Sequence, residues 1–262
     1  MRWKTTEYHG WGRALSAKGD IARPERISAL EELTKHTFAP AIGQLRSYGD
    51  AALNSGGKSI DMTRLDRVIG FDDETGVVTV EAGVKIGDLG SAFAPRGWIP
   101  PVMPGTGFAT VGGCISNDVH GKNHHHVGSF GQHVTEITLM QAGAPKKVSP
   151  TKNKRLFQAT VAGLGQTGII AEAKIQLVRC KGDMMVLTER RIDGWDEHIA
   201  ALDASDAAYT VGWIDATAKG AVLGRGILEE GEITSGISPT GGRAREIPID
   251  APSWALSGPV VR

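Results

Sequence analysis

The sequence has 262 residues, and its 29 basic and 29 acidic side chains give a formal net charge of zero. This balance, without a long basic run, argues against a nucleic-acid binder that relies on clustered positive charge. Two cysteines, Cys114 and Cys180, are too few for a disulfide framework, and no run of about 20 apolar residues is long enough to span a membrane.

The first half of the sequence predicts a helix followed by short strands. In "PERISALEELTKHTF" (24–38) we expect Pro24 in the first helical turn, and apolar residues follow at every third position from Ile27. Three further elements are predicted, namely a strand at 59–62, a strand at 77–81 after a turn at 73–76, and a short amphipathic helix at 86–94.

The second half predicts a hairpin around residues 142–145, a short helix within 153–163 and an alternating strand at 169–177. Beyond Cys180 the pattern predicts a strand, a helix and strands at 209–215 and 221–228. We therefore expect a domain boundary near residue 182 and a second domain that is incomplete, because the sequence ends in a Pro/Gly-rich segment.

The 35 glycines are about twice the usual share and gather in clusters. Three clusters are "IGQLRSYGD", "PGTGFATVGG" and "NDVHGKNHHHVGSFG". Backbone N–H groups in such turns form anion-binding nests, so the clusters predict loops that wrap a large dinucleotide. A fourth cluster, "GLGQTG" (163–168), has the Rossmann spacing, but a strand follows it where that motif needs a helix, so it predicts a turn.

Five of the eight histidines lie between residues 112 and 133. They leave three interpretations open: a metal site, a nucleophilic Cys114 with a histidine partner, and a ligand held mainly by the backbone. We expect the adjacent residues His124, His125 and His126 to point in different directions, which disfavours a metal. No oxyanion arrangement accompanies Cys114. The backbone-held ligand is the preferred interpretation, with no metal.

Three segments carry a family resemblance: "LRSYGDAALNSGG", "PGTGFATVGGCISNDVHGKNHHHVGSFGQHV" and "LFQATVAGLGQTGII". They resemble the flavin domain of the vanillyl-alcohol oxidase/p-cresol methylhydroxylase (PCMH-type) superfamily, above all its bacterial oxidases of decaprenylphosphoryl ribose. The resemblance spans about residues 8–180 and continues more weakly beyond them. It implies an α+β fold, with a PCMH-type FAD-binding domain of two subdomains at 1–182. The start of a sheet-based substrate (cap) domain, truncated, is implied at 183–262.

The resemblance also implies which residues bind FAD. They are Ala41, Ile42, Gly43, Gln44, Leu45, Arg46, Ser47, Tyr48, Gly49, Asp50 and Ala51 in a first loop, Gly105, Thr110, Val111, Gly112 and Gly113 in a second, Asn117, Asp118, Val119 and His120 beside the flavin, and Ile170 through its backbone. Leu45 stands where relatives have glycine, so the turn should deform or the flavin should shift. Tyr48 matches the position of a flavin-linking histidine in other members, so FAD should be non-covalent.

The implied activity is oxidation of a sugar hydroxyl to a ketone by hydride transfer to FAD. The expected substrate is decaprenylphosphoryl ribose or a similar polyprenyl-phosphate pentose, in the synthesis of cell-wall arabinan. The expected catalytic residues are His120 as the base and Lys122 as a cationic partner of reduced flavin or of a substrate phosphate. The alternatives are a flavin-binding but catalytically incomplete fragment and a sugar-1,4-lactone oxidase-like enzyme. A reductase or epimerase partner and a cytoplasmic location, peripheral at the membrane surface, are also expected.

Overall fold

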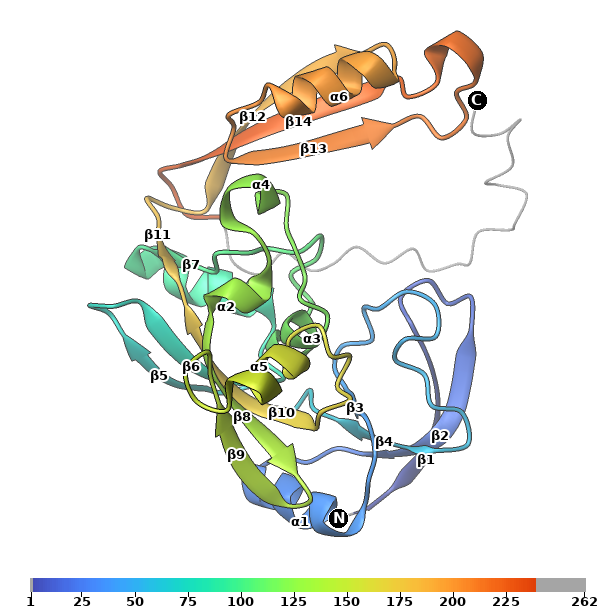
Figure 1. Ribbon diagram of the computed structural model, residues 1–262, viewed down its shortest axis with the longest axis vertical. Helices are drawn as coiled ribbons and strands as arrows, with labels where there is room; N and C mark the ends of the chain where they lie inside the picture. The colour runs from blue at the N-terminus through green and yellow to red at the C-terminus, as the bar shows by residue number, and fades with distance from the viewer. Residues whose placement is uncertain (1, 239–262) are drawn as a thin grey trace. The chain divides into compact units, whose positions relative to one another are not determined.

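The computed structural model describes residues 2–238, which form two compact units divided between Cys180 and Lys181 (Figure 1). The division falls two residues before the expected boundary. An FAD-binding domain at 1–182 and the start of a substrate domain at 183–262 stay predictions. Among the described residues, no helix has both the length and the apolar character needed to cross a membrane.

The first unit begins with a small mixed sheet. Its strands are β1 (Lys4–His9), β2 (Ser16–Ala22), β3 (Ala41–Ile42) and β4 (Lys58–Asp61), in the spatial order β1-β2-β4-β3. β1 and β2 form an antiparallel hairpin, and β4 runs parallel to both β2 and β3. A small apolar cluster built on Tyr8, Ala17 and Ile42 packs against Leu45, so the first predicted loop is anchored to this sheet.

The helix predicted at 24–38 is confirmed as α1 (Ile27–His36), which buries Leu30 and Leu33. The placement of Pro24 in its first turn was wrong. Arg26 is the N-cap in an extended conformation, and Pro24 lies in the approach to the helix. The fixed φ of proline therefore stabilises the connection between β2 and α1 instead of the helix.

The second sheet of this unit is antiparallel throughout, in the order β5-β6-β10-β8-β9. Its strands are β5 (Val68–Asp72), β6 (Val77–Glu81), β8 (Val134–Gln141), β9 (Ala144–Val148) and β10 (Ile169–Gln176). The alternation predicted for 169–177 is confirmed, because the odd-numbered side chains are buried. Together with the helices, this sheet confirms the predicted α+β class.

Helices α2 (Ile86–Phe93), α3 (Val111–Ser116) and α5 (Lys154–Thr160) lie beside this second sheet (Figure 1). The predicted apolar stripe of α2 is confirmed, since Ile86, Leu89 and Phe93 are all buried in the main core. A short pair of strands, β7 (Trp98–Ile99) and β11 (Val178–Arg179), closes the unit near its end. The main core therefore fixes the segments that lead into and out of the glycine-rich loops.

One buried carboxylate lies at the end of β6. Glu81 is 1% exposed, and its Oε1 and Oε2 accept hydrogen bonds from Arg67 Nη2 (2.6 Å) and Nε (3.0 Å). The backbone N–H of Arg67 donates a third bond to Oε2 at 2.9 Å. This charge-assisted pairing offsets the cost of burying Glu81 and fixes the chain just before α2.

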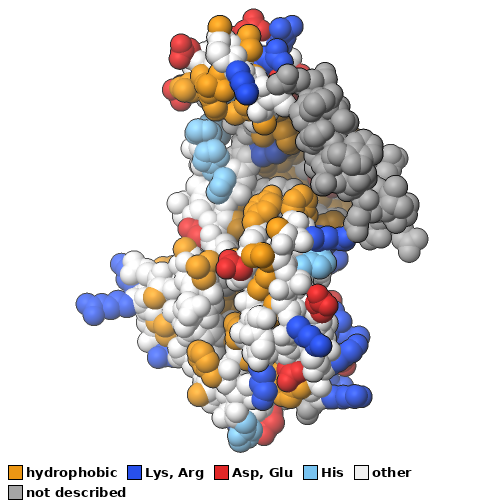
Figure 2. All heavy atoms as spheres, turned by 90° about the vertical axis from the view of Figure 1, so that its right-hand side faces the viewer, with side chains coloured by type: hydrophobic (Ala, Val, Ile, Leu, Met, Phe, Trp, Pro, Cys, Tyr) orange, Lys and Arg blue, Asp and Glu red, His pale blue; other side chains and the backbone are white. Residues whose placement is uncertain are grey.

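The second unit is a three-stranded antiparallel sheet in the order β12-β14-β13, with α6 (Trp195–Asp203) packed on it. The strands are β12 (Met184–Ile192), β13 (Tyr209–Ile214) and β14 (Gly226–Thr234). The strand predicted at 221–228 begins too early, because Gly220–Val222 form a 3-10 turn and Gly224 has a φ of 86°. Hydrophobic side chains are exposed on this unit (Figure 2), and four of them follow one another at 184–187 in β12.

Candidate functional site

The first predicted loop, residues 41–51, leaves the small sheet at β3 and turns across the surface of the first unit. Within the described part of the chain, the backbone N–H groups of residues 43–49 donate no hydrogen bond to another protein group. Gly49 has a φ of 58°, and a Cβ added there would meet nothing within 4 Å. The loop thus presents several backbone donors, with open space in front of part of it.

Leu45 adopts the left-handed conformation that glycine would favour, with a φ of 53°. The turn therefore keeps a glycine-like backbone even though the residue is leucine. An L-residue in this region costs roughly 1–2 kcal/mol. The half-buried Leu45 side chain offsets part of that cost by packing on the small apolar cluster of Tyr8, Ala17 and Ile42.

The second predicted loop, residues 105–113, meets the first at one close approach. A Cβ on Gly43 would lie 2.5 Å from Thr110 Oγ1 and 3.2 Å from Thr110 Cγ2. Thr110 cannot easily turn away, because it is buried and its Oγ1 accepts the N–H of Gly113 at 3.2 Å as the N-cap of α3. Only glycine at position 43 lets these two loops come together.

The backbone donors of the second loop are divided between two roles. Val111 N–H donates to Val84 O and Gly112 N–H to Ala82 O, each at 2.8 Å, so these two amides hold α3 to the chain after β6. Among the described residues, the N–H groups of Gly105, Thr106 and Gly107 have no protein acceptor. The first part of this loop, and not Val111 or Gly112, therefore offers its amides to a ligand.

Two cationic side chains gather where the loops meet. The guanidinium of Arg46 lies 4.9 Å from the ring centroid of Phe108, and the ammonium of Lys85 lies 5.9 Å from the same ring. Lys85 also pairs with Asp88 at 3.0 Å. Sequence reasoning missed Lys85 and Phe108. The available signal was a lysine directly before α2 and an aromatic residue inside the "PGTGF" run.

Asp118 organises the histidine-containing segment. Its φ is 42°, and its carboxylate accepts bonds from Gly131 N at 2.7 Å and from Ser129 Oγ at 2.8 Å. A single antiparallel bridge pairs His120 with Ser129. Asn117 donates its side-chain amide to Gly113 O at 2.8 Å. These contacts hold residues 117–120 against the short 3-10 helix at Phe130–His133.

The histidines are arranged differently from the prediction. His124 and His125 were expected to point apart, but their ring centroids are 4.1 Å apart, and those of His124 and His120 are 5.4 Å apart. The rings of His124 and His125 are tilted by 34° to each other, and both residues belong to a short helix, α4 (His124–Val127). Across residues 2–238, no three His, Cys, Asp or Glu side chains are placed to hold a metal ion.

Cys114 is fully buried in α3, and burial raises the pKa of its thiol to about 12. At neutral pH the thiol is therefore protonated, which argues against the nucleophile interpretation. We expect Ellman's reagent at pH 8 to modify the partly exposed Cys180 in the folded protein and to leave Cys114 unmodified. Both should react in denaturant, and two rapidly reacting thiols in the folded protein would contradict the burial of Cys114.

The turn at 161–168 joins this region from the other side. Ala162 N–H donates to Ile115 O at 3.1 Å and Leu164 N–H to Ser116 O at 2.9 Å, so the turn completes the end of α3. The strand β10 follows, which confirms that "GLGQTG" is a turn and not a Rossmann motif. Ile170 is buried and pairs with Leu139 of β8, and the ladder between β10 and β8 shifts register at the next residue, Ala171, whose carbonyl accepts the N–H of Ala82 at 2.9 Å.

The structure thus brings together the first loop with Thr110, residues 117–120 with residues 129–131, and the turn at 161–168 with the end of α3. Free backbone donors, two cations and an aromatic ring converge at the first of these places. The exposed imidazole of His120 and the exposed Lys122 lie in the segment that Asp118 organises. Such an arrangement suits an extended ligand with an anionic centre.

Comparisons with known proteins agree with this geometry. Residues 27–149 match the family model of the FAD binding domain. The chain is 39% identical over 242 residues to decaprenylphosphoryl-beta-D-ribose oxidase of Mycolicibacterium smegmatis, covering 87% of this chain and 52% of the relative. It is 27% identical over 183 residues to L-gulonolactone oxidase of Mus musculus, covering 67% of this chain and 41% of the relative.

Among solved structures, an alkyldihydroxyacetonephosphate synthase shares the fold with a TM-score of 0.67 at 16% identity. The match covers 78% of this chain and 40% of that chain. The chain therefore spans about half the length, or less, of the proteins that it resembles.

Proposed function

We propose that residues 27–149, which match the family model of the FAD binding domain, form a PCMH-type flavin domain, and that the chain is part of an oxidoreductase that oxidises a sugar hydroxyl to a ketone. FAD is the cofactor. The observation that carries the proposal is the convergence of two glycine loops, at Gly43 and Thr110, beneath Arg46 and Lys85. The predicted cofactor-binding residues and the predicted catalytic residues remain part of this proposal.

The residues at this convergence fit the pyrophosphate of FAD. The N–H groups of residues 43–49 and 105–107, which have no acceptor among residues 2–238, are hydrogen-bond donors, and Arg46 and Lys85 supply positive charge beside them. The space in front of Gly49 and Gly105 is open, since an added Cβ would meet nothing within 4 Å at either residue. Donors that are already oriented bind an anion with little reorganisation. Tyr48 offers no imidazole for a covalent bond, so we propose that FAD is held non-covalently.

When bound, FAD would supply the redox chemistry, as the acceptor of a hydride from the carbon that carries the substrate hydroxyl. The chain supplies the proton acceptor, and His120 is proposed for this role because its imidazole is exposed and its backbone is fixed by the bridge to Ser129. A neutral imidazole accepts a proton near neutral pH. Lys122, two residues on, is proposed to attract a substrate phosphate or the negative charge of reduced flavin.

The proposed substrate is a polyprenyl-phosphate pentose. The support is the resemblance to the decaprenylphosphoryl-beta-D-ribose oxidase over 87% of this chain. A second candidate is a sugar-1,4-lactone, which the resemblance to L-gulonolactone oxidase favours. Only the polyprenyl-phosphate pentose would imply a reductase or epimerase partner, a role in cell-wall arabinan synthesis and a location at the membrane surface.

The test is an anaerobic reduction experiment on the FAD-loaded chain. We expect a yellow protein that releases free FAD on acid precipitation, and whose absorbance near 450 nm disappears on adding farnesylphosphoryl ribose but not on adding gulonolactone. In the His120→Gln variant the bleaching rate should fall by about 10²- to 10⁴-fold, with FAD content unchanged. His126→Gln is the matched control, since it changes another exposed imidazole in the same segment.

Each of the other outcomes supports a different interpretation of this chain. Bleaching by the lactone alone would replace the first substrate with the second. Flavin that stays oxidised with both donors would leave a flavin-binding fragment without activity. A well-folded chain that takes up no FAD would overturn the proposal entirely.

A further inference from the structure

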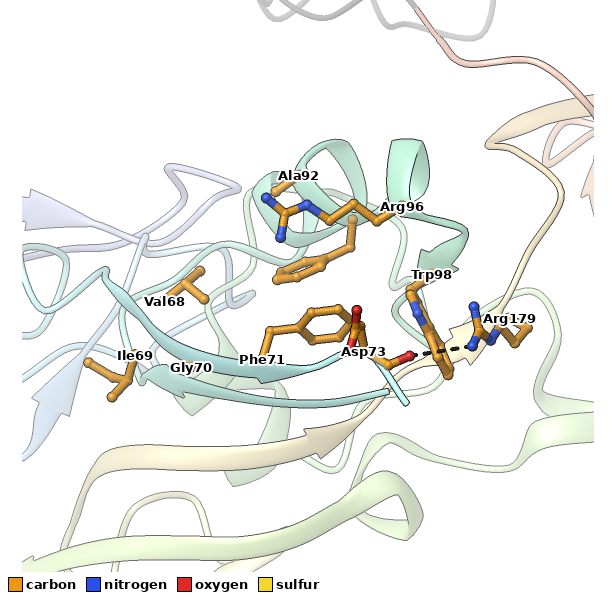
Figure 3. Close-up of a pocket in the computed structure, with 10 residues that line it drawn as sticks. Val68, Ile69, Gly70, Phe71, Asp73, Ala92, Arg96, Trp98 and Arg179 are labelled. Carbon is orange, nitrogen blue, oxygen red and sulfur yellow. Dashed lines mark hydrogen bonds between the residues drawn. The ribbon is translucent and has the colours of Figure 1, made fainter. Parts of the chain in front are cut away.

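A cavity lies in the first unit, away from the glycine loops. It has a volume of about 810 Å³, is open on one side and lies between the edge strand β5, the last turn of α2 and the β7/β11 pair (Figure 3). We propose that this cavity binds an amphipathic anion, a phosphate or carboxylate attached to an apolar chain. This proposal is separate from the oxidoreductase proposal and does not depend on it.

The floor and one wall of the cavity are aromatic and apolar. The ring of Phe71 lies 4.5 Å from that of Phe93 and 6.2 Å from that of Trp98. Along the edge strand, Val68 and Ile69 are 46% and 53% exposed. Exposed apolar side chains that continue a buried aromatic cluster are suited to contact an apolar ligand.

Arg96, Arg179 and Asp73 supply the polar part, and the two guanidinium groups leave the lining with an excess of positive charge over the single carboxylate. Arg179 stacks on Trp98, with its guanidinium 4.0 Å from the ring centroid, and donates one N–H to Asp73 O at 3.3 Å. Arg96 lies 5.8 Å from the ring centroid of Phe93. Within the described residues neither arginine forms an ion pair with a carboxylate, and Arg179 donates one hydrogen bond, to Asp73 O, so most of the N–H donors are available.

The position of Arg179 is prepared by the fold. Gly76 has a φ of 76°, and a Cβ there would lie 2.1 Å from the Trp98 ring, so the turn after β5 packs closely against one part of that ring. Arg179 then stacks on Trp98, and Asp73 O orients the guanidinium. A cation that is oriented before binding loses less entropy when it binds an anion.

The cavity and the cofactor loops contact opposite ends of α2. At its first turn, Gly87 N–H donates to Gly107 O at 2.8 Å, while Ala92 and Phe93 at its end line the cavity. A helix of this length spans about 12 Å. The cavity volume falls within the usual range of small-molecule sites, which is about 300–1,000 Å³. The two sites can therefore be tested independently in the same FAD-loaded chain.

The experiment measures binding of octyl phosphate, below its micelle concentration, to the FAD-loaded chain by isothermal titration calorimetry and tryptophan fluorescence. Octanol and inorganic phosphate are the two comparison probes. We expect octyl phosphate to bind at least about tenfold more tightly than octanol or inorganic phosphate, because it contacts both the apolar wall and the arginines of the cavity. Trp98→Phe should remove the fluorescence response and retain the calorimetric one.

The variants Arg96→Gln and Arg179→Gln should each weaken octyl phosphate binding by about tenfold and leave octanol binding unchanged. Arg155→Gln, on the exposed surface of α5, is the matched control and should change neither. FAD content and melting temperature verify that each variant is folded and loaded. Equal binding of octyl phosphate and octanol, or unchanged binding in the double arginine variant, would overturn the proposal.

Discussion

Replacing Gly43 with alanine is expected to raise the dissociation constant of FAD by about 100-fold. The added Cβ would lie 2.5 Å from Thr110 Oγ1, so the first and second loops must separate. Separation moves the free amides of the first loop away from those of residues 105–107 and costs two or three charge-assisted hydrogen bonds. Equilibrium titration of the apoprotein with FAD, followed by flavin fluorescence, measures the change.

Two matched glycine variants show whether the close approach is the cause. Gly105→Ala adds a Cβ in open space, so it should leave the melting temperature of the apoprotein unchanged. It should weaken FAD binding only if bound FAD occupies the space in front of Gly105. Gly90→Ala, inside α2 and also free of neighbours, should leave FAD binding unchanged and raise stability slightly. Wild-type affinity in Gly43→Ala would show that the two loops do not need to meet.

The regular elements of the first unit were predictable from local patterns. Period-two alternation identified β10, and an apolar stripe identified α2, because burial against one core selects both patterns. The errors fall where local conformation departs from the simplest rule. Pro24 stabilises an approach to a helix instead of its first turn, and the turn around Gly224 delays β14.

The candidate site was predictable only in part. The glycine clusters indicated loops near an anion, but the contact between Gly43 and Thr110 joins residues 67 positions apart, and no local pattern encodes it. The same holds for Lys85, which reaches Phe108 because α2 begins beside the second loop. Leu45 shows a different limit, since its side chain suggested a deformed turn while tertiary packing retained the glycine-like backbone. The arginine-lined cavity likewise combines residues 68–98, in the middle of the first unit, with Arg179 near its end.

Replacing Asp118 with alanine is expected to lower the free energy of unfolding of the first unit by about 3 kcal/mol. The substitution removes the acceptor of both Gly131 N and Ser129 Oγ, and it leaves alanine at a φ of 42°, where aspartate is better tolerated. Asp118→Asn should lose only about 1 kcal/mol, because asparagine retains an acceptor oxygen and also tolerates this backbone conformation. Chemical denaturation measures both values, and Asp66→Ala, an exposed aspartate in the same unit, is the matched control.

Amide exchange at Gly131 and the rate of flavin bleaching together distinguish a role of Asp118 in positioning His120 from an effect on stability alone. In Asp118→Ala the Gly131 amide should exchange with solvent about 100-fold faster under native conditions, because its acceptor is gone and the bridge from His120 to Ser129 is released. The rate of flavin bleaching should fall together with this protection, while FAD bound at the first and second loops is retained. If bleaching keeps its wild-type rate when Gly131 exchanges freely, then Asp118 does not position His120 for the reaction.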